Sequence, residues 1–215
     1  MSFVTNWGYT LTSVSTLSNF LTIAEFNSFT NSKFVGDARI EPNIKSASRS
    51  IQNYCGWHVY PNLECEMVYN MKDLRDCWKG TDLLIQLPSR MVTSVSSILL
   101  NCKFVDGEWT GIQTDDFSLD PTGLLRIFDC GMFDRRSNIR IVFNSGLTDG
   151  QMDVLKELTA HRVTHAVSSS YGITSESAGG VSVTYNASWA GNTRSTALPD
   201  DNKEILDPYL VKGVF

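Results

Sequence analysis

The chain has 215 residues and a formal net charge of −5, with 42% hydrophobic and 19% charged residues, which is typical of a globular protein with one core, or one core and a smaller satellite. Its basic residues are scattered, so we do not expect it to bind nucleic acid tightly. No segment approaches the ~20 apolar residues that cross a bilayer, and the first twenty residues lack the pattern of a secretion signal, so no membrane contact and a cytoplasmic origin are expected.

Two helices are predicted in the first quarter of the chain. The segment 21–30 begins with Thr22 and has Glu25 three residues later, which is the pattern of a capping box. A second helix starts after Asp37 or Glu41, either of which can cap it. Its apolar residues recur at helical spacing, which indicates one buried face: Ile40, Ile44, Ala47, Ile51 and Tyr54 or Cys55.

The stretch "NYCGWHVYPN" at 53–62 places a cysteine, a tryptophan and a histidine around one glycine. Cys55 and His58 lie on opposite sides of a glycine that ends the helix, and their neighbours are not electropositive, so a reactive thiol is not expected. We expect Trp57 and Val59 to pack against the core and His58 to form a local hydrogen bond. The stretch is therefore interpreted as a structural corner made by six residues: Tyr54, Cys55, Gly56, Trp57, His58 and Pro61.

From about Glu64 to Phe143 the hydrophobic period drops to two, which is typical of strands. The segments are short, rich in branched and aromatic residues, and separated by turn signals such as Asp106-Gly107. They are "ECEMVYN", "DLLIQLP", "VTSVSSILL", "CKFV", "LLRIF" and "NIRIVFN". Their spacing predicts an antiparallel sheet or a small barrel.

A helical pattern returns after Gly146, where Thr148 and Gln151 form a second possible capping box. The apolar face of this long helix has five members: Met152, Leu155, Leu158, Val163 and Ala166. The segment 180–186 is predicted to form a strand or hairpin arm, and "DDNKEILDPYL" a short last helix that Pro208 interrupts or ends.

The predicted fold class is α+β: a small helical bundle frame, an inserted antiparallel β-sheet or barrel block, and a protruding hairpin arm. The predicted divisions are an N-terminal arm (1–20), a helical frame (21–62, 147–172 and 199–212), the β block (63–146), the hairpin arm (173–198) and a tail end (213–215). The cysteines number five, and no two have Cys-x-x-Cys spacing, so we expect reduced thiols.

One set of residues has the spacing of a metal site. Glu157, His161 and His165 follow one another at four-residue intervals on the long helix, and a Glu/His/His set can bind zinc. The sequence "HRVTH" lacks the glutamate that follows the first histidine in helical zinc hydrolases. Neither a Gly-x-Ser-x-Gly elbow nor a phosphate-binding glycine loop is present. We therefore predict no catalytic residue, no metal and no cofactor.

The segment "DARIEPNIKSASRSIQNYCGWHVYP" (37–61) resembles the head–tail connector, or adaptor, proteins of long-tailed bacteriophages, which carry a Tyr-Cys-Gly-Trp-His-x-x-Pro corner. The resemblance continues, in order, over about residues 20 to 211. It includes "LLIQLPSRMVTSVSSILL", "FSLDPTGLLRIF", "NIRIVFNSGL", "SESAGGVSVTYN" and "ILDPYL". Where members of the family have a basic run after the last tyrosine, this chain keeps only Lys212.

The resemblance implies a non-enzymatic structural protein of the virion, made in the host cytoplasm. Members form a homo-oligomeric ring, commonly of twelve subunits, in the neck between the portal protein and the stopper or tail-completion protein. Such a ring extends the DNA channel, and a net-acidic ring lets double-stranded DNA pass without tight binding.

Three contact regions are hypothesised on this basis. The arm residues Val181, Val183 and Tyr185 would pair with an adjacent subunit or the next ring, and the long helix with His161 and His165 would line the channel or the subunit seam. The tail would dock on the portal through Ile205, Leu206, Tyr209, Leu210 and Phe215. Removal of residues 203–215 is then expected to leave a folded protein that cannot join portal-bearing heads.

Two alternatives stay open at this point. One is a metal-dependent enzyme that uses Glu157, His161 and His165, which would contain stoichiometric zinc. The other is a β-rich module that recognises a sugar on the host surface, which would be mounted at the tail tip instead of the neck.

Overall fold

The computed structural model describes residues 2–74, 77–101, 109–112, 116–120, 122–128, 137–168, 175–178, 181–184 and 200–211. The chain divides into two compact units, and each is built from separate stretches of sequence. The first unit contains residues 1–18, 55–149 and 209–215, and the second contains residues 19–54 and 150–208. The predicted class, α+β, is confirmed.

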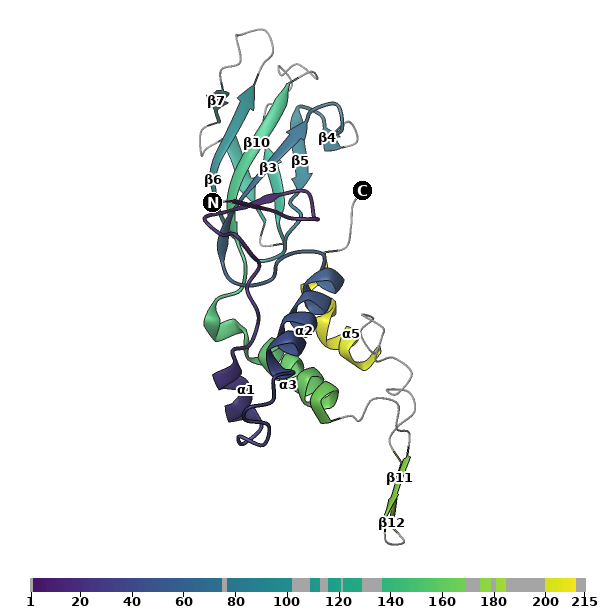
Figure 1. Ribbon diagram of the computed structural model, residues 1–215. Coiled ribbons are helices and arrows are strands. Elements are labelled where there is room, and N and C mark those ends of the chain that lie inside the picture. Colours follow the sequence, from purple (N-terminus) through teal and green to yellow (C-terminus); the bar gives the residue numbers. More distant parts are fainter. Residues whose placement is uncertain are drawn as a thin grey trace. The chain divides into compact units, whose positions relative to one another are not determined.

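The first unit is made of two antiparallel sheets (Figure 1). The six-stranded sheet has the order β1-β2-β3-β10-β6-β7, with bounds Ser2–Val4, Thr10–Thr12, Leu63–Asn70, Asn138–Ser145, Val92–Asn101 and Trp109–Gly111. The four-stranded sheet has the order β4-β5-β9-β8, with bounds Trp78–Lys79, Asp82–Gln86, Leu124–Ile127 and Phe117–Leu119. Neither sheet closes into a barrel among the residues described, so of the two predicted forms the open sheet is the one found.

Buried and partly exposed side chains alternate strictly along β10, so one face of the large sheet packs into the core. Ile139, Ile141 and Phe143 are fully buried, and the residues between them are partly exposed. This strand pairs with β3 on one side and β6 on the other, so its register is fixed by two ladders and by one apolar face. In the smaller sheet Leu83 and Ile85 alternate in the same way, and the core of the unit consists of these inward-facing rows.

The first twenty residues differ from the arm that the sequence suggested. Strands β1 and β2 form a hairpin, and β2 pairs with β3, which adds both strands to the large sheet. Tyr9 and Leu11 are buried there. Three-residue strands carry too little periodicity to be recognised from sequence, because alternation needs about four residues to show.

The second unit is helical. Its elements are α1 (Ile23–Phe29), α2 (Ile40–Cys55), α3 (Asp153–Ser168), α5 (Asp200–Leu206) and the β11–β12 hairpin (Ser175–Ala178 and Val181–Thr184). Apolar side chains from α1, α2, α3 and the residue before the cap of α1 make its core: Leu21, Phe26, Ile40, Ile44, Ala47, Ala160, Val163 and Val167. An ion pair of 2.6 Å between Lys156 and Glu25 joins α3 to the start of α1.

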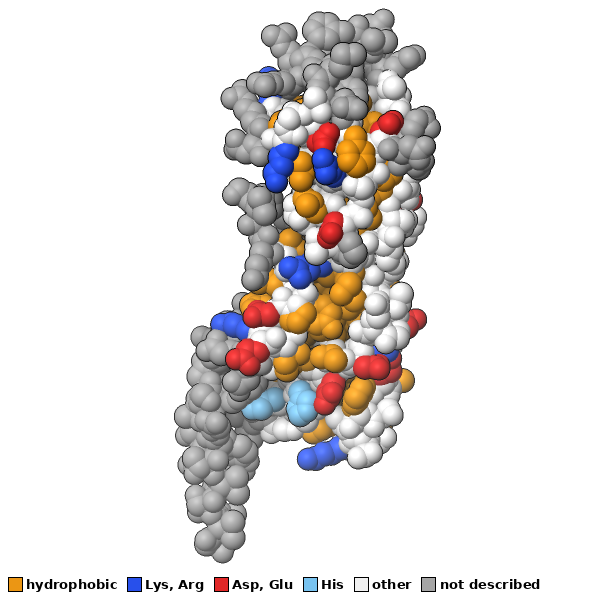
Figure 2. All heavy atoms as spheres, turned by 180° about the vertical axis from the view of Figure 1, so that it is seen from behind, with side chains coloured by type: hydrophobic (Ala, Val, Ile, Leu, Met, Phe, Trp, Pro, Cys, Tyr) orange, Lys and Arg blue, Asp and Glu red, His pale blue; other side chains and the backbone are white. Residues whose placement is uncertain are grey.

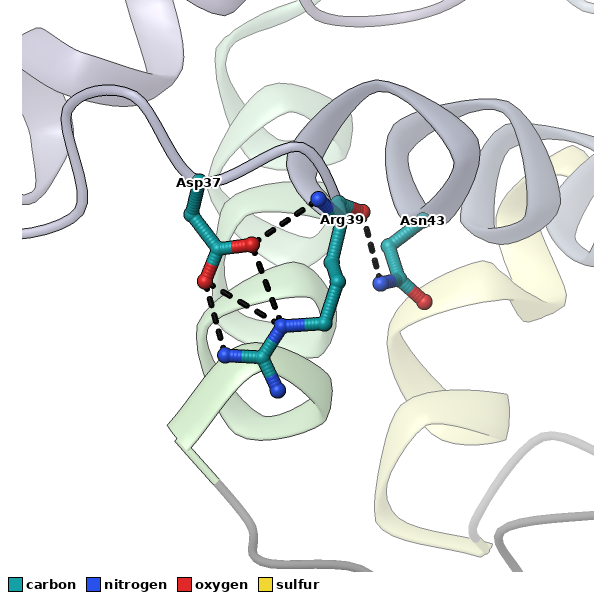
Figure 3. Close-up of polar contacts among 3 residues, drawn as sticks. All are labelled: Asp37, Arg39 and Asn43. Carbon is teal, nitrogen blue, oxygen red and sulfur yellow. Dashed lines mark hydrogen bonds and ion pairs between the residues drawn. The ribbon is translucent and has the colours of Figure 1, made fainter.

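Both predicted helix starts in the first quarter of the chain are found. Thr22 and Glu25 form the capping box, since each side chain bonds to the other residue's backbone N–H. Before α2, the Asp37 carboxylate accepts from the backbone N–H of Arg39 at 2.8 Å and from its guanidinium, and the Asn43 amide donates to the Arg39 carbonyl (Figure 3). The Asp37 contact satisfies a backbone N–H at the helix start, where N–H groups lack helical partners, and the Asn43 amide adds a second donor to the Arg39 carbonyl, which also accepts the Asn43 backbone N–H.

The start of the long helix is different from the prediction. A 3-10 turn, η4 (Asp149–Gln151), precedes α3, which begins only at Asp153. Thr148 therefore precedes this turn and Gln151 is its last residue, so the pair lies before the start of α3. At the other end of the chain α5 is followed by a second 3-10 turn, η5 (Asp207–Tyr209), which contains Pro208. The predicted strand at 102–105 lies outside the described residues.

Candidate functional site

The corner at 53–62 has a buried centre and exposed ends. Gly56 has a φ of +76°, the left-handed conformation expected of a residue that ends a helix. The next three residues, Trp57, His58 and Val59, have no solvent exposure. The peptide bond between Tyr60 and Pro61 is cis, and β3 begins two residues later. The expected packing of Trp57 and Val59 against the core is thus found.

His58 forms the centre of a buried hydrogen-bond network in the sheet unit. Its Nε2 lies 2.9 Å from the carbonyl oxygen of Ser145, which can only accept, so Nε2 carries the proton. Nδ1 is then the acceptor for the Tyr9 hydroxyl at 2.9 Å, and this hydroxyl accepts from the His58 backbone N–H at 3.0 Å. These bonds are long-range in sequence, and they accompany the predicted local hydrogen bond, which His58 makes with the backbone of Pro61.

The pKa values of His58 and Cys55 disfavour acid–base or nucleophilic chemistry at the corner. Burial lowers the pKa of His58 to about 4, so the ring is neutral at physiological pH. Burial also raises the pKa of the Cys55 thiol to about 12. A thiol that stays protonated cannot act as a nucleophile. The geometry and the charges agree that this cluster holds the fold in place.

The segment after α5 is attached to the corner within the sheet unit. The Trp57 indole donates to the carbonyl of Tyr209 at 2.6 Å, and the backbone N–H of Val211 donates to the carbonyl of Cys55 at 3.0 Å. In the helical unit, Leu206 is completely buried while Ile205 is 44% exposed. Among the tail residues singled out from sequence, Leu206 is therefore a core residue.

This attachment changes the expected effect of removing the tail. Removing residues 203–215 would delete a buried leucine and the acceptor of a buried indole, so the remaining protein would be destabilised. Ile205, Tyr209 and Leu210 keep some exposed surface. Phe215 lies outside the described residues, and so does Tyr185 of the arm.

A groove of about 610 Å³ runs between α3 and α5 in the helical unit. Its apolar lining consists of Val154, Leu158 and Ile205, and its polar lining includes His161, Arg162 and His165. Both of these histidines are exposed, and Figure 2 shows histidine side chains at the surface close to hydrophobic ones. The two histidines that sequence analysis placed on one helix face are thus brought together, at an open groove.

Arg162 is the residue of this groove that sequence reasoning missed. Its Nε and Nη1 atoms are buried, and no acceptor among the described residues lies within hydrogen-bonding distance of either. Burial lowers the pKa of the guanidinium, which nonetheless stays cationic at any physiological pH. The signal in the sequence is its position four residues after Leu158 and seven after Leu155, where a cation interrupts the edge of the apolar stripe.

The metal-enzyme alternative required a cluster at Glu157, His161 and His165. Among the residues that the structure describes, which include these three, no group of three or more His, Cys, Asp or Glu side chains is placed to hold a metal ion. Four-residue spacing puts the side chains along one face, but it does not make them converge on one point. In this structure, Glu157, His161 and His165 are therefore not assembled as a ligand set.

The hairpin arm is present as β11 and β12, which pair only with each other in the described part of the chain. The predicted strand at 180–186 corresponds to β12.

No helix in the described ranges has both the length and the apolar character needed to span a bilayer.

A family model of head completion proteins matches residues 19–210 of this chain. The chain belongs to the head completion protein family. The match covers nearly the same residues as the resemblance seen in the sequence, which is thereby confirmed. No curated protein sequence matches this head completion protein.

Two solved structures have the same fold as this head completion protein. One is a chain in the neck of an empty gene transfer agent particle computed with C6 symmetry, with a TM-score of 0.55 and 16% identity. The other is from the neck of a native gene transfer agent particle computed with C12 symmetry, with a TM-score of 0.57 and 14% identity. Each alignment covers 95% of this chain and 97% of the other chain.

Proposed function

We propose that this head completion protein is a structural component of the neck of a tailed phage or phage-like particle. In this proposal twelve copies form a ring between the portal and the stopper or tail, and the ring extends the DNA channel. The observation that carries the proposal is the family match over 192 residues, 19 to 210. The likeness in fold to chains of particle necks supports the same location, in the virion.

The charge of the chain supports a passive role toward DNA. Twelve copies with a formal net charge of −5 each would make a strongly acidic ring. A surface that neutralises few phosphates releases few counterions, so it gains little free energy from binding DNA. Double-stranded DNA would then pass through the ring without being retained.

Contacts with other neck components are proposed at the exposed part of the tail and at the arm. Ile205, Tyr209 and Leu210 supply apolar surface for the portal, while Leu206 anchors α5 in its own subunit. The arm and the α3 face with His161 and His165 are assigned to the seam between subunits. The role is structural, and no step of chemistry is part of the proposal.

Electron microscopy of particles tests the location. The protein carries a small gold-binding tag at its N-terminus, and we expect the label at the neck, with a ring of twelve subunits when portal-bearing heads are present. A label at the tail tip would instead favour the host-recognition alternative and refute the proposal.

A pair of substitutions tests the tail contact. Ile205→Asp is expected to lower the yield of tailed particles at least about tenfold, since a contact worth about 1.4 kcal/mol changes binding tenfold. Val35→Asp, at a residue 65% exposed in the same unit, serves as the matched control. Equal yields from the two variants would refute the tail assignment.

A further inference from the structure

The six-stranded sheet has a short strand at each of its two edges. β1 is outermost on the side of β2, and β7 is outermost on the side of β6. Neither strand pairs with a further strand in the described part of the chain. Charged side chains and prolines commonly keep the edge of a sheet from pairing with another chain, and neither the sequence of β1, SFV, nor that of β7, WTG, contains one. Both edges can therefore accept another strand.

The backbone groups of Val4 point toward the free edge of β1. Thr5 donates its N–H to the Tyr9 carbonyl at 3.0 Å, so these two residues form a hydrogen-bonded pair. Hydrogen-bonded and non-hydrogen-bonded pairs alternate along an antiparallel ladder, so the next pair, Val4 with Thr10, is of the second kind. The N–H and C=O groups of Val4, and those of Ser2 two residues earlier, are therefore directed away from β2.

The same alternation identifies the free groups of β7. Ile112 donates its N–H to the Ile98 carbonyl at 2.9 Å, one residue beyond the pair of Gly111 with Leu99. The N–H and C=O groups of Gly111, and those of Trp109 two residues earlier, are therefore directed away from β6. Each edge thus presents two residues at the same spacing, and the two edges can form two hydrogen-bonded pairs with each other.

Strand direction and side-chain alternation also match between the two edges. Each strand of the six is antiparallel to its neighbours, so β1 and β7 run in opposite directions. A second copy rotated about an axis near the strand direction therefore brings its β1 antiparallel to β7. Val4 lies in one row with Glu66, and Trp109 in one row with Asn138, and both rows are on the face away from the core. The joined sheets then keep one continuous outer face.

The side chains that meet in this arrangement fit each other. The register that uses all the free groups places Val4 opposite Trp109 and Ser2 opposite Gly111. Val4 is 74% exposed, the highest value among the exposed large apolar side chains that the structure describes. The Arg140 guanidinium lies 4.8 Å from the centroid of the Trp109 ring and supports the indole on this face. Pairs of an aromatic and a β-branched residue stabilise sheets when they lie directly opposite each other.

We propose that β7 of one subunit pairs with β1 of the next, so that the large sheets of neighbouring subunits join edge to edge. The inference rests on the proposed ring and names a contact that closes it. Each subunit contributes two different edges, which is the heterologous arrangement of a cyclic assembly. The contact consists mainly of backbone hydrogen bonds, together with the pair of Val4 and Trp109.

The offset between the two edges sets the inclination of the strands in such a ring. β1 is aligned with Cys65 of β3, and β7 is aligned with Tyr69, four residues further along. Four residues correspond to about 13 Å, and six strand spacings to about 29 Å. The strands would then be inclined by about 25° to the ring axis, and inclined strands are a general property of closed sheets.

Disulfide trapping between two single variants tests the pairing. Cells that assemble particles produce a Ser2→Cys protein with a C-terminal tag together with an untagged Gly111→Cys protein, and the particles are treated with diamide. We expect a mixed dimer of one tagged and one untagged chain, which only an intermolecular contact can give. Val68→Cys is the matched control for Ser2→Cys, because Val68 is exposed on the same face but on the interior strand β3. It should give at most about a tenth as much mixed dimer.

A proline at the free edge provides a second readout. Val4→Pro removes an N–H that points away from β2, so the β1–β2 ladder is kept while the donor to the next subunit is lost. Incorporation into particles should fall at least about tenfold relative to Val4→Ala, which keeps the N–H. Circular dichroism of both purified variants shows that they are folded. Equal incorporation of the two variants would contradict the pairing.

The edge contact and the neck function can fail separately. If the label is at the neck but Ser2→Cys gives no more mixed dimer than Val68→Cys, the edge pairing is refuted and the neck function stands. If the Ser2→Cys protein forms disulfide dimers only with itself, two β1 edges meet and the heterologous contact is refuted. A label away from the neck refutes the ring itself.

Discussion

Replacing His58 by glutamine is expected to remove a specific dependence of stability on pH. The folded protein keeps the ring neutral down to about pH 4, whereas an unfolded histidine takes up a proton near pH 6.5. Below pH 6.5 the unfolded chain therefore binds a proton that the folded chain does not, and the free energy of unfolding falls as the pH is lowered toward 4. The contribution of the neutral His58 ring to the free energy of unfolding is fully present above pH 6.5.

The magnitude follows from the two pKa values. Between pH 7 and pH 5 the linkage relation gives a loss of about 2 kcal/mol from this single group in the wild-type protein. His58→Gln keeps a donor for the Ser145 carbonyl but loses the bond with Tyr9, so at pH 7 it should be less stable by about 1–3 kcal/mol. At pH 5 most of this difference should be gone, because glutamine does not titrate.

Urea unfolding, followed by tryptophan fluorescence at pH 7, 6 and 5, measures this difference directly. Tyr9→Phe is the control, since it removes the neighbouring hydroxyl and leaves a buried imidazole, so its stability should still fall as the pH is lowered. Parallel curves for the wild type and His58→Gln between pH 7 and pH 5 would refute the reasoning. NMR of the wild-type protein should show that the His58 ring does not titrate above about pH 5.

Three further outcomes are expected. Gly146→Ala should destabilise the protein by about 2 kcal/mol or more in urea unfolding, since its φ is +130° and a Cβ would overlap the backbone of the proline corner. Lys156→Ala should cost about 0.5–1 kcal/mol at neutral pH and low salt. The ion pair holds the pKa of Glu25 at about 2, so the difference between Lys156→Ala and the wild type should fade as the pH drops from about 4.5 toward 2 in acid-unfolding curves. Native protein treated with iodoacetamide at pH 8 should remain unmodified at Cys55 and Cys65, because burial raises the pKa of both thiols to about 12. Mass spectrometry of the peptides measures this modification.

Much of the helical unit could be predicted because its signals are local. The capping box at Thr22, the apolar stripe of α2 and the glycine that ends it each depend on residues within four positions of one another. Strands β3, β5, β6, β9 and β10 were similarly visible through alternation, whereas the two- and three-residue strands β4, β7 and β8, which contain no buried residue, were not. The expected packing of Trp57 and Val59 could be predicted because an apolar pair directly after a helix-ending glycine is placed to meet the core.

The remaining features depend on contacts between distant segments. Tyr9 meets His58 across 49 residues, and nothing in either stretch indicates the other. Leu206 is one of the apolar tail residues, and the sequence pattern fits contact with the portal as well as burial in the core. Only the packing in the structure, where Leu206 is fully buried, distinguishes these two roles. The groove at Arg162 arises where α5 lies beside α3, so the lack of an acceptor for its Nε and Nη1 among the described residues could not be inferred from either helix alone.

The division of the chain has a consequence for biosynthesis. The sheet unit combines stretches that are far apart in the sequence, because 209–215 belong to it together with 1–18 and 55–149. The acceptor for the Trp57 indole is supplied 152 residues later, by Tyr209. A ribosome covers the most recently made residues, so this bond cannot form until Tyr209 has left the ribosome. A subunit should therefore become competent to assemble only after that point of synthesis, which would limit premature joining of nascent chains to a ring.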